Sequence, residues 1–93
     1  MQTIDIKSLD AHSFEVKVQG LNTTTHIVSV RPDYAEKLVG GKVPMESLIR
    51  SSFEFLLARE SNTSILRSFD LAVIARYFPE YEREIGKMLA QTS

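Results

Sequence analysis

The sequence lacks cysteine and tryptophan, and it holds only three prolines and four glycines among 93 residues. The absence of cysteine excludes disulfide bonds and thiolate chemistry, and it is consistent with a reducing cytoplasm. The chain also has no basic excess, because the net charge is −1 and both signs are mixed along it. A dedicated nucleic-acid-binding protein usually carries a basic surface, so the charge does not favour that function.

No apolar run approaches the ~20 residues that a membrane-spanning helix needs. The first ten residues, MQTIDIKSLD, alternate and carry acids, unlike a secretory signal. With 43% hydrophobic and 25% charged residues, the composition is that of an ordinary soluble globular protein. We therefore expect a single domain over residues 1–93, located in the cytoplasm and without membrane contact.

The first third of the chain carries the pattern of β-strands. Apolar side chains occupy every second position over residues 3–7 and again over 13–19, which is typical of strands with one buried face. A third β-rich run follows over residues 23–30. We predict an antiparallel meander of about three strands within residues 1–31, with a two-stranded ribbon and a loose first segment as the alternative.

Residues 44–60, PMESLIRSSFEFLLARE, carry the clearest helical pattern of the chain. Pro44 suits the first helical position, and Glu46 favours the positive end of the helix dipole. The apolar side chains that follow cover an arc of about 200° on the helix, wider than the stripe of a one-sided surface helix. The pattern predicts a central helix that is buried on two sides and keeps one narrow exposed face.

A shorter helix is expected before the central one, and a single helical turn after it. Pro32 can open the first helix, and Gly40 and Gly41 are expected to stop it. The polar residues SNTS follow the central helix, and a single turn is expected over residues 65–68.

Two further helices are expected near the end of the chain. Asp70 is expected to act as the N-cap of a helix over residues 71–78, and another helix is expected over residues 80–90. The predicted fold class is therefore α+β: a small N-terminal antiparallel sheet is followed by three or four helices within residues 32–93.

Residues 64–82, SILRSFDLAVIARYFPEYE, resemble a group of small bacterial proteins that are known only as conserved and uncharacterised. The resemblance extends back through FEFLLARE and covers roughly the C-terminal half of the chain. It implies a bacterial, cytoplasmic protein and carries no known activity.

A strand, Pro32, a helix, a glycine turn and ESLIRSSFEFLL look like the ribbon-helix-helix family of DNA-binding regulators and antitoxins. In that family the strand pairs with its twin in a dimer, and its alternate side chains read the major groove. The chain departs from the family in its short first helix, in Val43-Pro44 before the second helix and in the extra strands before the ribbon. The resemblance implies these anion or DNA contacts: Thr23, Thr25, Ser29 and Arg31.

Catalytic and metal-binding patterns are weak throughout the sequence. His12 and His26 are isolated from each other on different elements, which makes a poor metal site. The serines have no G-x-S-x-G motif, and Gly41-Lys42 has no phosphate-binding loop around it. We therefore expect no catalytic residue, no metal and no cofactor, and a protein that is not an enzyme.

Large aromatic residues crowd a short region near the C-terminus. A domain this small buries most of its large side chains, and any surplus forms an exposed patch of the kind that marks partner surfaces. The predicted partner surface consists of Phe69, Arg76, Tyr77, Phe78 and Tyr81.

The leading hypothesis is a non-enzymatic protein-interaction module of an uncharacterised bacterial family, whose partner is another protein or a second copy in a homodimer. The alternative is a ribbon-helix-helix-like DNA-binding regulator or antitoxin, and only this alternative involves nucleic acid. The two differ in a simple observation, because DNA binding falls steeply as the salt concentration rises.

Overall fold

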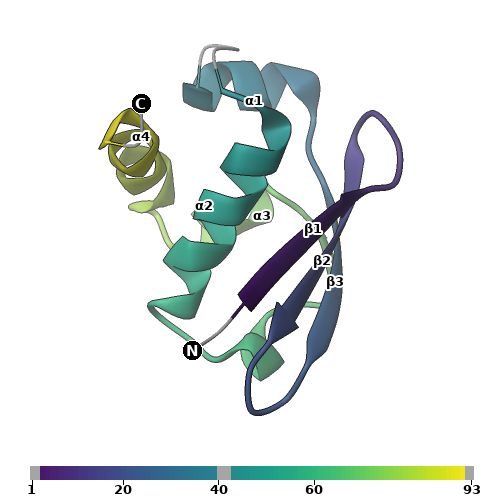
Figure 1. Ribbon diagram of the computed structural model, residues 1–93. Helices are drawn as coiled ribbons and strands as arrows, with labels where there is room; N and C mark the ends of the chain where they lie inside the picture. Colours follow the sequence, from purple (N-terminus) through teal and green to yellow (C-terminus); the bar gives the residue numbers. More distant parts are fainter. Residues whose placement is uncertain (1–2, 40–42, 92–93) are drawn as a thin grey trace.

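The computed structural model describes residues 3–39 and 43–91 of the chain. These residues form a small sheet with helices packed on one of its faces, which confirms the predicted α+β class (Figure 1). The expected helix stop at Gly40 and Gly41 lies outside the described residues.

The described residues form a four-stranded sheet with the strand order β1-β2-β3-β4. Strands β1 (Thr3–Ser8), β2 (Ser13–Gln19) and β3 (Thr24–Ser29) follow one another as an antiparallel meander, as predicted. The short strand β4 (Ser68–Asp70) comes from much later in the chain and lies parallel to β3. The sequence patterns did not predict this fourth strand.

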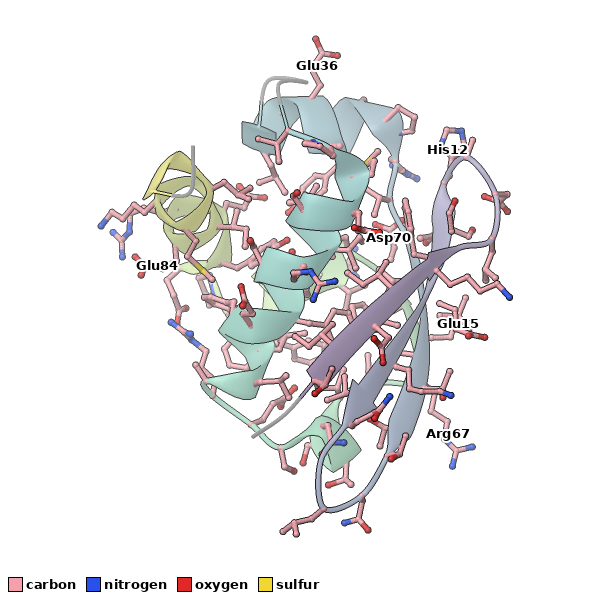
Figure 2. All side chains as sticks on the ribbon, viewed as in Figure 1. His12, Glu15, Glu36, Arg67, Asp70 and Glu84 are labelled. Carbon is pink, nitrogen blue, oxygen red and sulfur yellow. The ribbon has the colours of Figure 1, made fainter. Side chains whose placement is uncertain are left out.

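The alternating pattern of the strands divides the sheet into a buried and an open face. Val16, Val18 and Val28 point to the helices and have no exposed surface. Their neighbours point the other way, and Figure 2 shows Glu15 and Arg67 directed away from the helices. Burying one face of a sheet in this way fixes its register, because a shift by one residue would expose every valine.

Four α-helices and one short 3-10 helix are present in the part of the chain that the structure describes. None of these helices is long and apolar enough to cross a membrane. Their bounds are α1 (Pro32–Val39), α2 (Met45–Leu57), η1 (Asn62–Ser64), α3 (Val73–Tyr77) and α4 (Tyr81–Gln91).

Helix α2 lies between the sheet and α4, so it is buried on two sides as predicted (Figure 1). Two aromatic residues, Phe53 and Phe55, show this division. The ring of Phe53 lies 5.4 Å from the ring of His26 on the sheet, while the ring of Phe55 lies 5.3 Å from that of Tyr81 on α4. The narrow exposed face carries charged residues, Glu46, Arg50 and Glu54.

The central helix spans Met45–Leu57, so it starts one residue later and ends three residues earlier than the predicted 44–60, and Pro44 is its N-cap rather than its first helical residue. At the end of the helix, the backbone N–H of Arg59 donates to the carbonyl of Leu56, three residues back, which tightens the last turn. The side chain of Asn62 then holds the following segment to the sheet. Its amide donates to the carbonyl of Asn22 at 2.7 Å.

Two predictions for the segment after η1 are wrong. The helical turn expected over residues 65–68 is replaced by η1, which lies earlier in the chain, and by β4. Asp70 ends β4 and is not the N-cap of a helix. Its carboxylate nevertheless accepts hydrogen bonds, from the N–H of Ala72 at 3.0 Å and from the hydroxyl of Ser29 at 3.1 Å. This carboxylate therefore ties β3 to the turn that leads into α3.

Candidate functional site

A groove of about 420 Å³ lies between the end of α2, the middle residue of β4 and α3. Concave, mostly apolar surfaces with a few polar groups are the usual binding sites of proteins. We call this hollow the β4–α3 groove. Its apolar lining comes from α2, from the segment before β4, from β4 itself and from α3 with its C-cap. These residues are Leu56, Ile65, Leu66, Phe69, Val73, Ile74, Tyr77 and Phe78.

Helical spacing in α3 explains which side chains face the groove and which face the core. Val73 and Tyr77 are four residues apart and therefore lie on one face of the helix. Ile74 and Phe78 form the next row, where Ile74 is buried and Phe78 packs against the core. The helix ends before Pro79, which cannot continue it. The four side chains therefore supply both the wall of the groove and its attachment to the core.

The floor of the groove is fixed to the central helix by aromatic contacts. The ring centroid of Phe69 lies 6.1 Å from that of Phe53, and the ring centroid of Phe78 lies 5.8 Å from that of Phe55. Aromatic pairs at such distances add to the stability gained from burial alone. The groove is thus built on the rigid core of the molecule.

The rim of the groove exposes two large apolar side chains. Leu66 is 48% exposed and Tyr77 is 68% exposed. Tyrosine is enriched in protein interfaces because its ring offers a large contact area and loses little conformational entropy. These two residues line an apolar hollow. Leu21, at the β2–β3 turn, is also exposed, but the hollow that it lines is otherwise formed by glycine and polar residues.

The end of the groove next to α2 is polar, where Glu60 and Ser64 line it. Among the described residues, the half-buried carboxylate of Glu60 has no hydrogen bond or ion pair. The neighbouring Arg59 is fully engaged: its guanidinium lies 3.7 Å from the ring centroid of Phe55 and 3.4 Å from the carboxylate of Glu80. Glu60 is therefore an available negative charge beside an apolar hollow.

Three residues of the predicted partner surface, Phe69, Tyr77 and Phe78, meet in the β4–α3 groove. Tyr81 does not, and including it in an exposed surface was wrong. It has no exposed surface, and its hydroxyl forms a 2.6 Å hydrogen bond with that of Ser52 on α2. The packing of α4 against α2 accounts for this burial.

Arg76 lies on another side of α3, in a second hollow that also contains Arg31, Asp33 and Asp70. Both signs of charge meet there, and Arg76 and Arg31 are both exposed. The structure therefore separates Arg76 from the aromatic residues with which we grouped it.

Sequence patterns missed Leu66, Val73 and Glu60 as groove residues. Val73 could have been found, because it lies four residues before Tyr77 in a predicted helix. Leu66 and Glu60 carried no such signal. They reach the groove only because the chain after α2 turns back to place β4 beside β3.

The four residues implied by the ribbon-helix-helix resemblance do not form a DNA-reading ribbon. That family needs a strand with a free edge that can pair with its twin, whereas β3 lies between β2 and β4. Thr25 is exposed and lies on the open face of the sheet, where Ser29 donates its hydroxyl hydrogen to Asp70. Thr23 precedes the strand, and Arg31 follows it. The described fold is therefore not a ribbon-helix-helix.

The two histidines lie in different settings. His12 is exposed in the β1–β2 turn, while His26 is buried. His26 Nδ1 donates to the carbonyl of Leu66 at 2.7 Å, and Nε2 lies 2.9 Å from the hydroxyl of Thr24. The amide of Asn62 donates to the same hydroxyl at 3.1 Å, so this hydroxyl is free to donate to Nε2. In the described residues, no group of three or more His, Cys, Asp or Glu could hold a metal ion.

Two tyrosines and one aspartate have shifted pKa values, and none of them lines the groove. Burial raises the pKa of Tyr81, with the hydrogen bond to Ser52 acting in the opposite direction. Partial burial, and then the hydrogen bond that Tyr34 donates to Glu82, raise the pKa of Tyr34. The exposed Asp10 has a lowered pKa, mainly because its carboxylate accepts a hydrogen bond from a backbone N–H in its turn.

Comparison with protein-family models, with curated proteins and with solved structures gave no match. The resemblance of residues 64–82 to an uncharacterised bacterial family therefore stays a prediction.

Proposed function

We propose that this protein is a non-enzymatic interaction module that binds a segment of a partner protein in the β4–α3 groove. The observation that carries the proposal is the pair of exposed side chains, Leu66 and Tyr77, on the rim of an apolar hollow with a fixed floor. A partner side chain that enters the hollow removes both from water, and such central apolar anchors supply most of the energy of an interface.

Other exposed apolar residues of the described chain do not combine in this way. Leu9 and Leu21 lie in the two hairpin turns, and Ile27 lies on the open face of the sheet among polar neighbours. Single exposed apolar residues are normal in soluble proteins, whereas grouped ones mark interaction sites. The proposal includes a cytoplasmic location, which the cysteine-free sequence favours.

Paired variants test the proposal in the native host of the protein. The full chain is tagged and compared with the double variant Leu66→Ser/Tyr77→Ser, and quantitative mass spectrometry identifies the proteins that co-purify. The matched control is Leu21→Ser, which removes an exposed leucine far along the chain from the groove. Circular dichroism checks that each variant is folded.

We expect at least one protein to be retained by the wild-type chain and by Leu21→Ser, and to be lost from the double variant. An identical set of proteins with all three chains would contradict the proposal. Loss of a second copy of this chain alone would show that the groove forms a homodimer.

A further inference from the structure

Strand β4 supplies Phe69 to the groove and also forms one edge of the sheet. Strand order places β4 at the end of the sheet, with β3 on its inner side and no described strand beyond it. A strand at the edge of a sheet presents unpaired backbone groups, which are a template for another chain.

The register of β4 identifies which backbone groups point outward. The N–H of Ile27 donates to the carbonyl of Arg67 at 2.7 Å, and the N–H of Leu71 donates to the carbonyl of Ser29 at 2.8 Å. In a parallel ladder, alternate residues of a strand bond to the same neighbour. Arg67 and Leu71 thus face β3, and so does the residue midway between them. The N–H and C=O groups of Ser68 and Asp70 therefore point to the outer edge.

A side chain occupies one backbone group on the other edge of the sheet. The guanidinium of Arg50, on α2, donates to the carbonyl of Ile4 in β1 at 2.9 Å. This contact occupies an edge group of β1, and charged side chains of this kind reduce pairing with other chains. The two edges thus differ in this respect, and β4 is the edge strand that contributes a side chain, Phe69, to the apolar groove.

The groove offers side-chain recognition next to this edge. Phe69 belongs to β4 and lines the groove, with Leu66 on one side along the chain and Tyr77 on the other. At the polar end, the carboxylate of Glu60 has no ion pair in the described chain. A basic side chain beside it would complement its charge.

We propose that the partner segment is an extended strand that adds to the outer edge of β4, inserts an apolar side chain between Leu66 and Tyr77, and carries a Lys or Arg that pairs with Glu60. This inference rests on the proposed function and names the chemistry of its partner. Recognition of this kind gains affinity from backbone hydrogen bonds and specificity from pockets for alternate side chains.

Selection from a phage library of random peptides tests the inference with the full chain as the target. We expect the selected peptides to share an apolar anchor with Lys or Arg nearby, and to bind Leu66→Ser/Tyr77→Ser poorly. Because an exposed ion pair contributes little to affinity, Glu60→Gln should weaken the binding of these peptides only about two- to fivefold. Peptides newly selected on Glu60→Lys should carry Asp or Glu in place of the basic residue. Peptides selected on the control Glu36→Lys, a change at an exposed position of α1, should keep Lys or Arg.

Peptides with single N-methylated backbone amides test the strand pairing. An extended strand directs alternate N–H groups to one neighbour, so methylation should weaken binding about tenfold at alternate positions and have little effect between them.

The outcomes separate this inference from the function on which it rests. Peptides that need Leu66 and Tyr77 but carry no basic residue, or show no alternation on methylation, would overturn the inference and leave the docking function standing. If no selected peptide depended on Leu66 and Tyr77, both would be overturned.

Discussion

Hydrogen bonds of buried polar side chains hold the layers of the described fold together. In the described residues, every buried polar side-chain atom has a hydrogen-bond partner. Ser52 and Tyr81 join α2 to α4, while His26 and Asn62 join the sheet to the segment that follows α2. Because an unpaired buried polar group is costly, removing one partner should destabilise the fold more than losing the contact alone.

Replacement of His26 tests this pairing at one residue. His26→Ala leaves a cavity under Phe53 and removes the donor to the carbonyl of Leu66, so we expect a loss of about 3 kcal/mol in the free energy of unfolding. The control is His12→Ala, at an exposed turn position. The backbone N–H of residue 12 keeps its hydrogen bond to the Asp10 carboxylate, so the free energy of unfolding should change by less than about 0.5 kcal/mol. Urea denaturation measures both, and equal effects would contradict the prediction.

The buried hydroxyl of Tyr81 gives the stability a dependence on alkaline pH. Burial raises its pKa in the folded chain above the ordinary value of about 10. The folded chain therefore holds this proton more tightly than the unfolded chain does. The resulting contribution to stability is complete below about pH 10 and is lost as the pH rises above it.

We expect Tyr81→Phe to lower the free energy of unfolding by about 1 kcal/mol at neutral pH, through loss of the bond to Ser52. The same change should flatten the fall in stability between about pH 10 and pH 11.5. Tyr77→Phe, at an exposed position, should change neither the free energy of unfolding at neutral pH nor its fall at alkaline pH. An unaltered alkaline slope in Tyr81→Phe would show that its burial does not set this dependence.

At the scale of elements, the sequence predicted those strands and helices whose residue pattern is set by which of their own faces are buried. Strands β1, β2 and β3 were visible because one buried face imposes alternation, and α2 was visible because two buried sides impose a wide apolar arc. Strand β4 has only three residues, SFD, and two of them are polar. Its existence depends on pairing with β3 about 40 residues earlier, and single-sequence periodicity carries no information on that pairing.

Helix α4 contains a glycine that its structure does not require. Apart from its chain neighbours and the backbone of its own helix, a Cβ at Gly86 would meet no atom within 4 Å, and glycine lowers helix stability through its backbone freedom. We expect Gly86→Ala to raise the free energy of unfolding by about 0.5–1 kcal/mol. The stability of Gly86→Ser should lie between that of the wild-type chain and that of the alanine variant. The shift in the urea midpoint measures this effect, and a destabilised alanine variant would mean that α4 needs the glycine for its packing.

In the molecule as a whole, some residues of the candidate site could be predicted from the sequence pattern and others could not. The aromatic crowding of Phe69, Tyr77 and Phe78 was visible in the sequence because large side chains in a small domain exceed what its core can bury. Tyr81 was misplaced because its burial depends on how α4 crosses α2. Leu66 and Glu60 were missed because their place in the groove depends on β4.

The oligomeric state follows from the same geometry. Edge strand β1 is partly covered by Arg50, and β4 offers only three residues, too few for a stable self-paired dimer. We expect sedimentation velocity to show a monomer over a wide concentration range. A dimer that Leu66→Ser/Tyr77→Ser dissociates would make the second copy the occupant of the groove.

Photo-crosslinking from the groove shows whether another protein lies against it in the cell. A photoreactive amino acid replaces Tyr77 in one chain and Leu21 in another, and both are irradiated in the native host. We predict a discrete adduct with another protein from position 77 and none from position 21, with the crosslink mapping to a segment that holds an apolar residue near a Lys or Arg. Equal labelling from both positions, or no adduct from position 77, would contradict the account.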